Sequence, residues 1–228
     1  MKKIITVDGP AGSGKEKISK YIARKYKLYH LDSGILYRRL AYELSKKNIK
    51  TFEVDKIKKL LKNIKKLSLR KTQVLRREQI GKAASDIAKL DFVRYFINFQ
   101  QRLATQTLNK KKGFVIDGRD IGSVVFKKAF LKLYIDVHVN IRAKRRYKQL
   151  IDNGEKSIYL KILEDIKLRD KKDKTRKNSP LVVPKGAKII DNSQAFKKTI
   201  AQIRNIIEGI NWWKTQYQIK YQMKNMKL

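Results

Sequence analysis

The most specific chemical signal in the chain is a glycine-rich run near its start. The run matches the first seven positions of the phosphate-loop pattern G-x-x-x-x-G-K-[ST] with Gly9, Pro10, Ala11, Gly12, Ser13, Gly14 and Lys15. Glycines permit a tight turn whose backbone N–H groups point at phosphate oxygens, and the lysine supplies an ammonium group to the β- and γ-phosphates. The run lies between an apolar stretch at residues 4–7 and a helical pattern over 15–26. This context predicts a nucleotide-phosphate site.

The position after the lysine departs from the pattern. A serine or threonine hydroxyl is expected there to contact phosphate or the Mg²⁺ shell, but the chain has Glu16 and Lys17. A carboxylate suits the positive end of a helix, yet it repels a triphosphate unless it points away. We therefore expect Mg²⁺ to be held mainly by water, phosphate and Asp117, or turnover to be impaired.

Two further groups of polar residues follow predicted strands. Ser33 stands at the start of a helical pattern and Arg38 about one turn later, where a guanidinium can clamp a phosphate; the alternative is that Ser33 is only a helix cap. Asp117, Arg119 and Asp120 follow the apolar run at 113–117. The carboxyl end of such a strand is where α/β folds place Mg²⁺ and substrate. A turn-stabilising Arg–Asp pair is the alternative there.

Two clusters of arginine fall at helical spacing in the second half of the chain. Arg142, Arg145 and Arg146 share one helix face, and Arg169 and Arg176 are spaced by seven residues with Asp173 between them. Phosphoryl transfer depends mainly on charge stabilisation and positioning, so arginines on a closing lid suit that reaction. A solvated basic face is the alternative.

These residues need an alternating framework to position them. Strands are predicted at residues 4–7, 113–117, 131–136 and 187–190, with another ending near residue 32. Helices are predicted at residues 15–26, 34–47, within 51–75, 78–90, 92–109, 141–153, 157–169 and from about 194. The alternation predicts a parallel α/β sheet flanked by helices. We expect one domain over residues 1–228, with mobile inserts at about 49–112 and 141–185.

Composition narrows the class of protein. The chain has 228 residues, 42% of them hydrophobic, which excludes a disordered chain, and no cysteine, which excludes disulfides, cysteine zinc sites and thiol nucleophiles. It contains no apolar stretch long enough to span a membrane, and we expect a cytoplasmic monomer. The net charge is +37. We expect it to reflect codon bias together with an anionic substrate, and not binding to a polyanion. His30, His138 and one of Trp212 and Trp213 are expected to be structural, and the basic tail 214–228 to be a fraying end.

Taken together, the segments resemble the bacterial cytidylate kinases over nearly the whole chain. The residues that carry the resemblance are those at 8–15, 31–34 with Tyr37 and Arg38, 83–85, 117–122 with 124–126, 142–146, Arg169 and Asp170 with Asp173 and Arg176, and 180–181. The resemblance implies the P-loop nucleoside monophosphate kinase fold, with a monophosphate-binding insert at 49–112 and a lid at 141–185. It also implies transfer of the γ-phosphoryl group of ATP to CMP or dCMP, with Mg²⁺.

The same resemblance implies roles for individual residues. Ser85 would contact the cytosine ring, helped by Ser33, and Arg38, Arg94, Arg119 and Arg176 would hold the acceptor phosphate. Asp120 and Asp173 would bind sugar hydroxyls or the base, Arg169 would bridge the two phosphates, and Arg145 and Arg146 would cover ATP. Asp117 would lie near Mg²⁺. Glu16 and Lys17 differ from the residues usual in the family at those positions.

Two other functions fit parts of the sequence. One is a kinase of the same fold with another acceptor, such as UMP or AMP. The other is a catalytically degenerate nucleotide-binding protein that holds nucleic acid through its basic surface, for which Glu16, Lys17 and the surplus of lysine are the only support.

Overall fold

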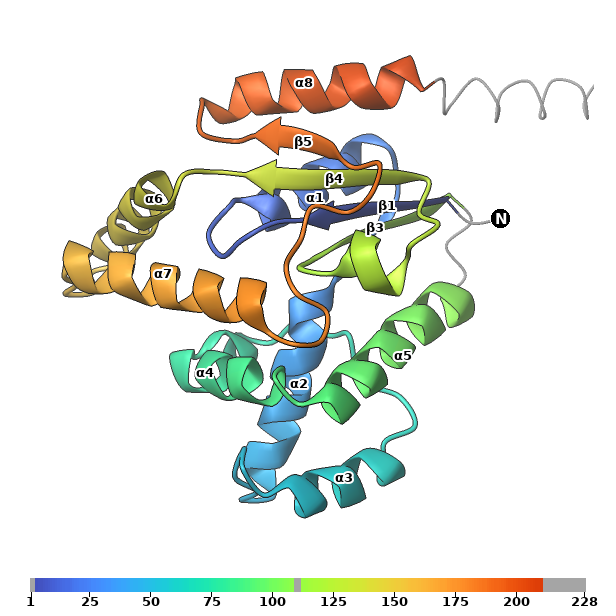
Figure 1. Cartoon of the computed structure of the whole chain (residues 1–228), viewed down its shortest axis with the longest axis vertical. Helices are drawn as coiled ribbons and strands as arrows, with labels where there is room; N and C mark the ends of the chain where they lie inside the picture. The colour runs from blue at the N-terminus through green and yellow to red at the C-terminus, as the bar shows by residue number, and fades with distance from the viewer. Residues whose placement is uncertain (1–2, 109–111, 211–228) are drawn as a thin grey trace, which may run out of the picture.

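The computed structural model describes residues 3–108 and 112–210 of the chain. Within them, five strands form one sheet in the order β2-β3-β1-β4-β5, and each neighbouring pair is parallel (Figure 1). The strands are β1 (Lys3–Asp8), β2 (Tyr29–Asp32), β3 (Gly113–Gly118), β4 (Leu131–Asp136) and β5 (Lys188–Asp191). Parallel neighbours require crossover connections, which helices supply here. The predicted parallel α/β class is therefore confirmed.

The helices connect the strands and extend the domain. They are α1 (Lys15–Lys25), α2 (Ser33–Lys46), α3 (Val54–Asn63), α4 (Glu78–Ile87), α5 (Asp91–Thr107), α6 (Val139–Asp152), α7 (Tyr159–Thr175) and α8 (Phe196–Gly209). In Figure 1, α8 runs along the β5 edge, α6 and α7 lie side by side, and α2 to α5 gather on the opposite side from α8. No helix in the described ranges is long and apolar enough to cross a bilayer.

Adjacent residues of β3 belong to two different cores. Val115 of β3 belongs to the cluster that contains Ile22 of α1 and Ile203 of α8. Its neighbour Ile116 belongs instead to the cluster that contains Ala104 of α5. This follows from the pleat, which turns successive side chains to opposite faces. Because both faces of the sheet are covered at β3, all six of its residues are buried and its sequence is a nearly continuous apolar run.

A third core lies among α2, α3, α4 and α5. Leu40, Ile57, Ile80 and Ile97, one from each helix, are buried there with Leu75 of the 3₁₀ turn η1 (Gln73–Arg76). The amphipathic spacing of residues 57, 60, 61 and 64 correctly predicted α3. This helical unit has a core of its own, and α5 also packs on the sheet through Ala104. The unit carries several of the residues described below.

The structure differs from the predicted elements in two places. The helix predicted over residues 157–169 continues to Thr175, since the charged residues there are compatible with a helix and Pro180 is the first breaker. No element is predicted for the residues that directly follow Asp120, but they form a π-helical turn, η2 (Ile121–Val125). Trp212, Trp213 and the tail 214–228 lie outside the described residues.

Candidate active site

The glycine-rich loop joins β1 to α1. Gly12 and Gly14 have φ values of +72° and +84°, the left-handed region that glycine adopts without steric cost. Lys15 is the first residue of α1, and its Nζ donates to the carbonyl oxygen of Pro10 at 3.1 Å, so the ammonium folds back over the loop. Burial, reinforced by the nearby Arg119, lowers the pKa of Lys15 to about 7. A cation above the N-terminus of a helix is a suitable receptor for phosphate.

Two buried side chains brace the outside of this loop. Asn192, just after β5, donates from Nδ2 to the carbonyl oxygen of Ser13 at 2.8 Å. Arg142 of α6 donates to the carbonyl oxygen of Ala11 at 2.9 Å and pairs with Asp170 of α7 at 2.6 Å. The loop is therefore fixed from two elements that come late in the chain.

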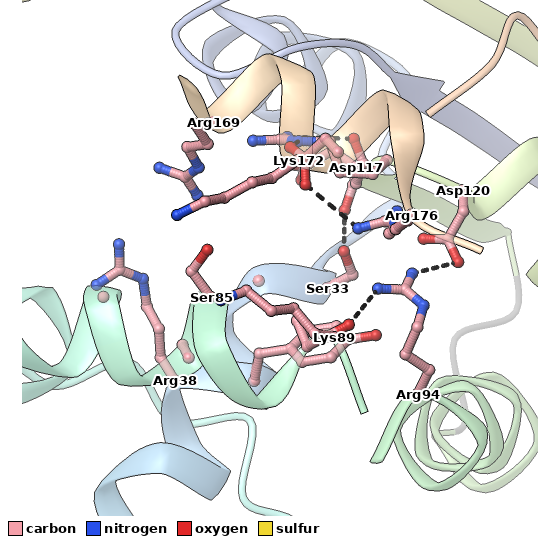
Figure 2. Close-up of a pocket in the computed structure, with 18 of the residues that line it drawn as sticks. Ser33, Arg38, Ser85, Lys89, Arg94, Asp117, Asp120, Arg169, Lys172 and Arg176 are labelled. Atoms are coloured by element: carbon pink, nitrogen blue, oxygen red, sulfur yellow. Dashed lines mark hydrogen bonds and ion pairs between the residues drawn. The ribbon is translucent and has the colours of Figure 1, made fainter. Parts of the chain in front are cut away.

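A cavity opens beside Lys15, between α2, α4, α7 and the loop after β3 (Figure 2). All the residues predicted to be catalytic or to bind the acceptor line it: Lys15, Ser33, Arg38, Ser85, Arg94, Asp117, Arg119, Asp120, Arg169, Asp173 and Arg176. Tyr37, Lys89 and Lys172 also line it. Segments far apart in sequence thus meet at one polar cavity, and its lining carries several cations.

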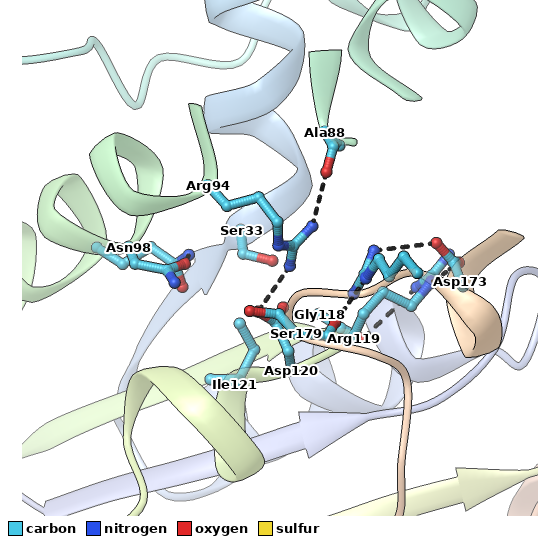
Figure 3. A network of polar contacts seen from close by, with 12 residues as sticks. Ser33, Ala88, Arg94, Asn98, Gly118, Arg119, Asp120, Ile121, Asp173 and Ser179 are labelled. Atoms are coloured by element: carbon cyan, nitrogen blue, oxygen red, sulfur yellow. Dashed lines mark hydrogen bonds and ion pairs between the residues drawn. The ribbon is translucent and has the colours of Figure 1, made fainter. Parts of the chain in front are cut away.

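Three of the arginines are held by two carboxylates (Figure 3). Arg94 donates from Nη2 to Asp120 at 2.6 Å, and Arg119 and Arg176 donate to the two oxygens of Asp173 at 2.8 and 3.2 Å. Burial alone would raise the pKa of Asp173, but Arg119 and Arg176 hold it below its usual value. A guanidinium has five N–H donors, so each arginine is oriented while keeping donors for an anion.

Arg169 is in a different situation. No described residue forms a hydrogen bond or ion pair with its guanidinium, which faces the cavity from α7 (Figure 2). Loss of surrounding water, reinforced by Arg119, lowers the pKa of Arg169 to about 10. A cation held near other cations without a partner has a site prepared for a negatively charged ligand.

Asp117 lies at the end of β3 with its carboxylate against His30 of β2. The two are joined by a hydrogen bond of 2.5 Å between Nε2 and Oδ1, and Ser33 donates to the backbone carbonyl of Asp117 at 2.6 Å. Burial raises the pKa of Asp117, although the hydrogen bond from His30 opposes this shift. His30 was expected to be structural; it contacts a site residue, which its position in the sequence did not indicate.

The donor set suits a cation that arrives with a nucleotide. Among the described residues no three carboxylate or imidazole groups converge as a metal site of their own. Asp117 supplies one carboxylate close enough to influence Lys15. Mg²⁺ at phosphates is commonly held by one or two carboxylates, water and phosphate oxygens, and the residues present fit that mode.

Asp8, at the end of β1, fixes the loop that carries Arg119 and Asp120. It is fully buried, and its two oxygens accept the backbone N–H groups of Ile121 and Gly122 at 2.8 and 2.7 Å. Burial raises the pKa of Asp8 to about 6, against the effect of these two hydrogen bonds. The phosphate-loop strand and the arginine loop are therefore tied together.

The remaining predicted ATP contacts lie outside the cavity. Arg145 donates to the carbonyl oxygens of Ser193 and Gln194 at 3.4 Å, and Arg146 donates to Gln149 at 3.1 Å. Lys17 points at the ring of Phe196, 4.2 Å from its centre. Glu16 pairs with Lys20 at 2.6 Å, so its carboxylate has partners other than a phosphate.

Several residues of the site gave no signal in the sequence. Asn192 and His30 act through neighbours that are distant along the chain, and only the fold brings them together. Lys89 and Lys172 are two lysines among 57 basic residues, so composition hides them. Asp8 is among the residues that carry the family resemblance, but the sequence predicts no role for it.

Together the fold and the site define a class: a P-loop kinase, with a phosphate loop facing an arginine-lined cavity for a second substrate. A family model described as cytidylate kinase matches residues 5–211. The chain is 39% identical over 195 residues to a cytidylate kinase from Bartonella bacilliformis, covering 84% of this chain and 87% of that protein. It is 37% identical over 217 residues to a cytidylate kinase from Caldicellulosiruptor saccharolyticus, covering 89% and 94%.

The chain belongs to the cytidylate kinase family. Among solved structures, the protein TT1252 from Thermus thermophilus matches with a TM-score of 0.51 and 12% identity, over 91% of this chain and 97% of that one. At that identity the likeness concerns the fold alone.

Proposed function

We propose that this protein transfers the γ-phosphoryl group of ATP to CMP or dCMP, giving ADP and CDP or dCDP. The observation that carries the proposal is one cavity in which Lys15, Ser85 and the arginines of four elements meet. Membership of the cytidylate kinase family supports the identity of both substrates. In addition, the net charge of +37 attracts the anionic substrates. The proposed protein is a cytoplasmic monomer without a nucleic-acid partner.

The donor side is formed by residues 9–17. Backbone N–H groups of the loop and the ammonium of Lys15 hold the β- and γ-phosphates, with the positive end of α1 aimed at them. Arg145 and Arg146 on α6 cover ATP when the lid closes. Both side chains are exposed and held only by long or flexible contacts, so little is lost when they turn toward a nucleotide.

The acceptor side is formed by the cavity between α2, α4 and α7. Ser85, with Ser33, contacts the cytosine ring, and Asp120 and Asp173 bind sugar hydroxyls or the base. Arg38, Arg94, Arg119 and Arg176 hold the acceptor phosphate. Because Asp120 and Asp173 already orient three of these arginines, the phosphate enters a receptor that needs little rearrangement.

Transfer is in line, without a covalent enzyme intermediate. Lys15, Arg169 and Arg176 stabilise the charge that spreads over the moving phosphoryl group, which is the largest contribution a protein makes to this chemistry. Asp117 would hold Mg²⁺ that arrives with ATP, in part through water, and the ion would supply positive charge that offsets the charge of the phosphates. The hydrogen bond from His30 keeps the Asp117 carboxylate in one orientation.

Two inserts in a single domain would enclose the substrates. We assign residues 49–112 as the monophosphate-binding insert and 141–185 as the lid. α3, α4 and α5 share one core, which supports an insert built as a unit, and residues of α2 in the same core anchor it to the rest of the domain. Closure excludes water, which suppresses hydrolysis of ATP.

The test is ADP formation from Mg-ATP with CMP, dCMP, UMP, AMP and GMP in turn. We expect turnover with CMP and dCMP only. Turnover with another acceptor would keep the kinase assignment and remove cytosine recognition from Ser85. Absence of turnover with every acceptor would contradict the proposal.

A further inference from the structure

Glu16 stands where the phosphate loop departs from its pattern, and it has a partner from a remote segment. Lys71 lies between α3 and η1, in the proposed monophosphate-binding insert. Its Nζ is 3.8 Å from Oε1 of Glu16 and 3.0 Å from Oδ2 of Asp32, at the end of β2. One ammonium group therefore faces two carboxylates that belong to two different elements.

This arrangement matters because of where Glu16 stands. It directly follows Lys15 in the first turn of α1, beside the place where the helix N-terminus meets donor phosphates. Asp32 adds a second negative charge that acts on Glu16. Uncompensated, the two carboxylates would oppose the field that Lys15 and the helix N-terminus create for a triphosphate.

Lys20 alone is a weak compensation. It pairs with Glu16 at 2.6 Å, but both side chains are about half exposed and the pair is spaced i, i+4 on one helix. Such pairs contribute little because water screens them. Lys71 is also exposed, at 35% of its side chain against 45% for Lys20, but it comes from another segment and holds the less exposed Asp32 as well as Glu16. Arg38 also lies within the field of Glu16 and Asp32.

We propose that Lys71 is a positioning residue for ATP. By neutralising Glu16 and Asp32, and by holding the Glu16 carboxylate away from the phosphates, it lets a loop that lacks the usual hydroxyl residue bind the donor. It also connects the acceptor insert to the donor loop. The identity of the donor rests on the proposed function; the contacts of Lys71 do not.

A double-mutant cycle tests this proposal. Wild type, Lys71→Met, Glu16→Ser and the double variant are compared by the Kd of a non-hydrolysable ATP analogue and by the KM of ATP and CMP. Lys62→Met is the matched control, because Lys62 is an exposed lysine of the same insert, on the last turn of α3. Lys71→Arg should retain binding, since arginine can also face two carboxylates. Melting temperatures identify any variant that fails to fold.

We expect Lys71→Met to weaken binding of the analogue about tenfold, equal to about 1.4 kcal/mol, with the KM of CMP nearly unchanged. In the Glu16→Ser background the same substitution should cost less than about threefold, because coupled sites are not additive. Equal losses in both backgrounds, or none in either, would overturn the proposal.

The proposed function and the role of Lys71 can be contradicted independently of each other. A wild-type protein that binds the analogue but phosphorylates no monophosphate would contradict the proposed function, while the binding cycle would still decide the role of Lys71. An active enzyme whose Lys71 and Glu16 are uncoupled would contradict only the role of Lys71.

Discussion

At the scale of single residues, Arg142 on α6 and Arg169 on the neighbouring helix α7 have different surroundings, and their roles differ accordingly. Arg142 on α6 is buried and pairs with Asp170, which also lets it hold the phosphate loop through Ala11. Arg169 on α7 is one residue before Asp170, yet no described residue pairs with it. The first guanidinium maintains the fold, and the second is available to a ligand.

The different surroundings of Arg169 and Arg142 predict that replacing arginine by glutamine lowers activity at the first position and stability at the second. Arg169→Gln should lower kcat at least about a hundredfold and change the free energy of unfolding by less than about 0.5 kcal/mol, since no internal contact is lost. Arg142→Gln should destabilise the protein by about 3 kcal/mol, because it leaves Asp170 unpaired in the interior. Steady-state kinetics and urea denaturation measure the two effects. A large loss of stability in Arg169→Gln would contradict the interpretation.

Lys15 predicts a pH dependence of ATP binding. Its pKa of about 7 in the free protein will rise when phosphates surround the ammonium. Above pH 7 a proton must therefore be taken up on binding, and affinity should fall by up to about tenfold per pH unit as pH rises. Below pH 7 the dependence should flatten.

Calorimetry at pH 8 in buffers of different ionisation enthalpy measures this proton uptake. Lys15→Met should remove it along with most of the catalytic activity. The sign is opposite for the stability of the free protein. Because the folded pKa of Lys15 is below its unfolded value, this lysine costs stability at pH 6 and the cost is relieved as pH rises from 7 toward 10.

At the scale of elements, the glycine loop depends on its neighbours as much as on its own sequence. Gly14 combines a φ of +84° with a close approach, since an added Cβ would lie 2.6 Å from Nδ2 of Asn192. Gly186 has a similar φ of +76° but open space around it. Substitutions at the two positions can therefore distinguish the effect of a left-handed backbone from the effect of a steric clash.

Gly186→Ala should cost about 1 kcal/mol of stability through its left-handed backbone and leave activity unchanged. Gly14→Ala should carry the same cost, displace Asn192 from Ser13 and weaken binding of an ATP analogue at least about tenfold. Thermal unfolding and calorimetric titration of both variants make the comparison. Equal binding by the two variants would show that Asn192 does not brace the loop.

Prediction from the sequence succeeded for elements with a strong period and for motifs with local spacing. The strand 113–117 and the amphipathic pattern of α3 are examples. The residues expected to bind the acceptor, from Ser33 to Arg176, line one cavity, and their roles remain predictions. Prediction failed where tertiary contacts decide. The turn η2 exists because Asp8 accepts its first N–H groups, and α7 runs past Arg169 because nothing breaks it before Pro180. His30 and Asn192 became visible only through partners supplied by the fold.

At the scale of the whole molecule, the protein has a net charge of +37, and lysines and arginines outnumber carboxylates in the lining of its cavity. Long-range attraction of anionic substrates accelerates encounter, and salt screens it. We expect kcat/KM for both substrates to fall about tenfold between roughly 50 and 300 mM salt, with kcat nearly constant. Initial-rate kinetics at several salt concentrations measure this. A kcat/KM independent of salt would mean that the surplus lysines do not guide substrates.

The contact between Asn192 and Ser13 has a consequence for synthesis of the chain. The phosphate loop leaves the ribosome well before the residue that braces it, which follows β5 at a separation of 179 residues. Translation takes on the order of tens of seconds to cover that interval. β1 is also synthesised before both of its sheet partners, β3 and β4, which follow it by more than a hundred residues. Throughout that interval the nascent chain therefore carries its nucleotide motif without the hydrogen bond that fixes the loop, and we expect its affinity for ATP to rise once Asn192 has emerged.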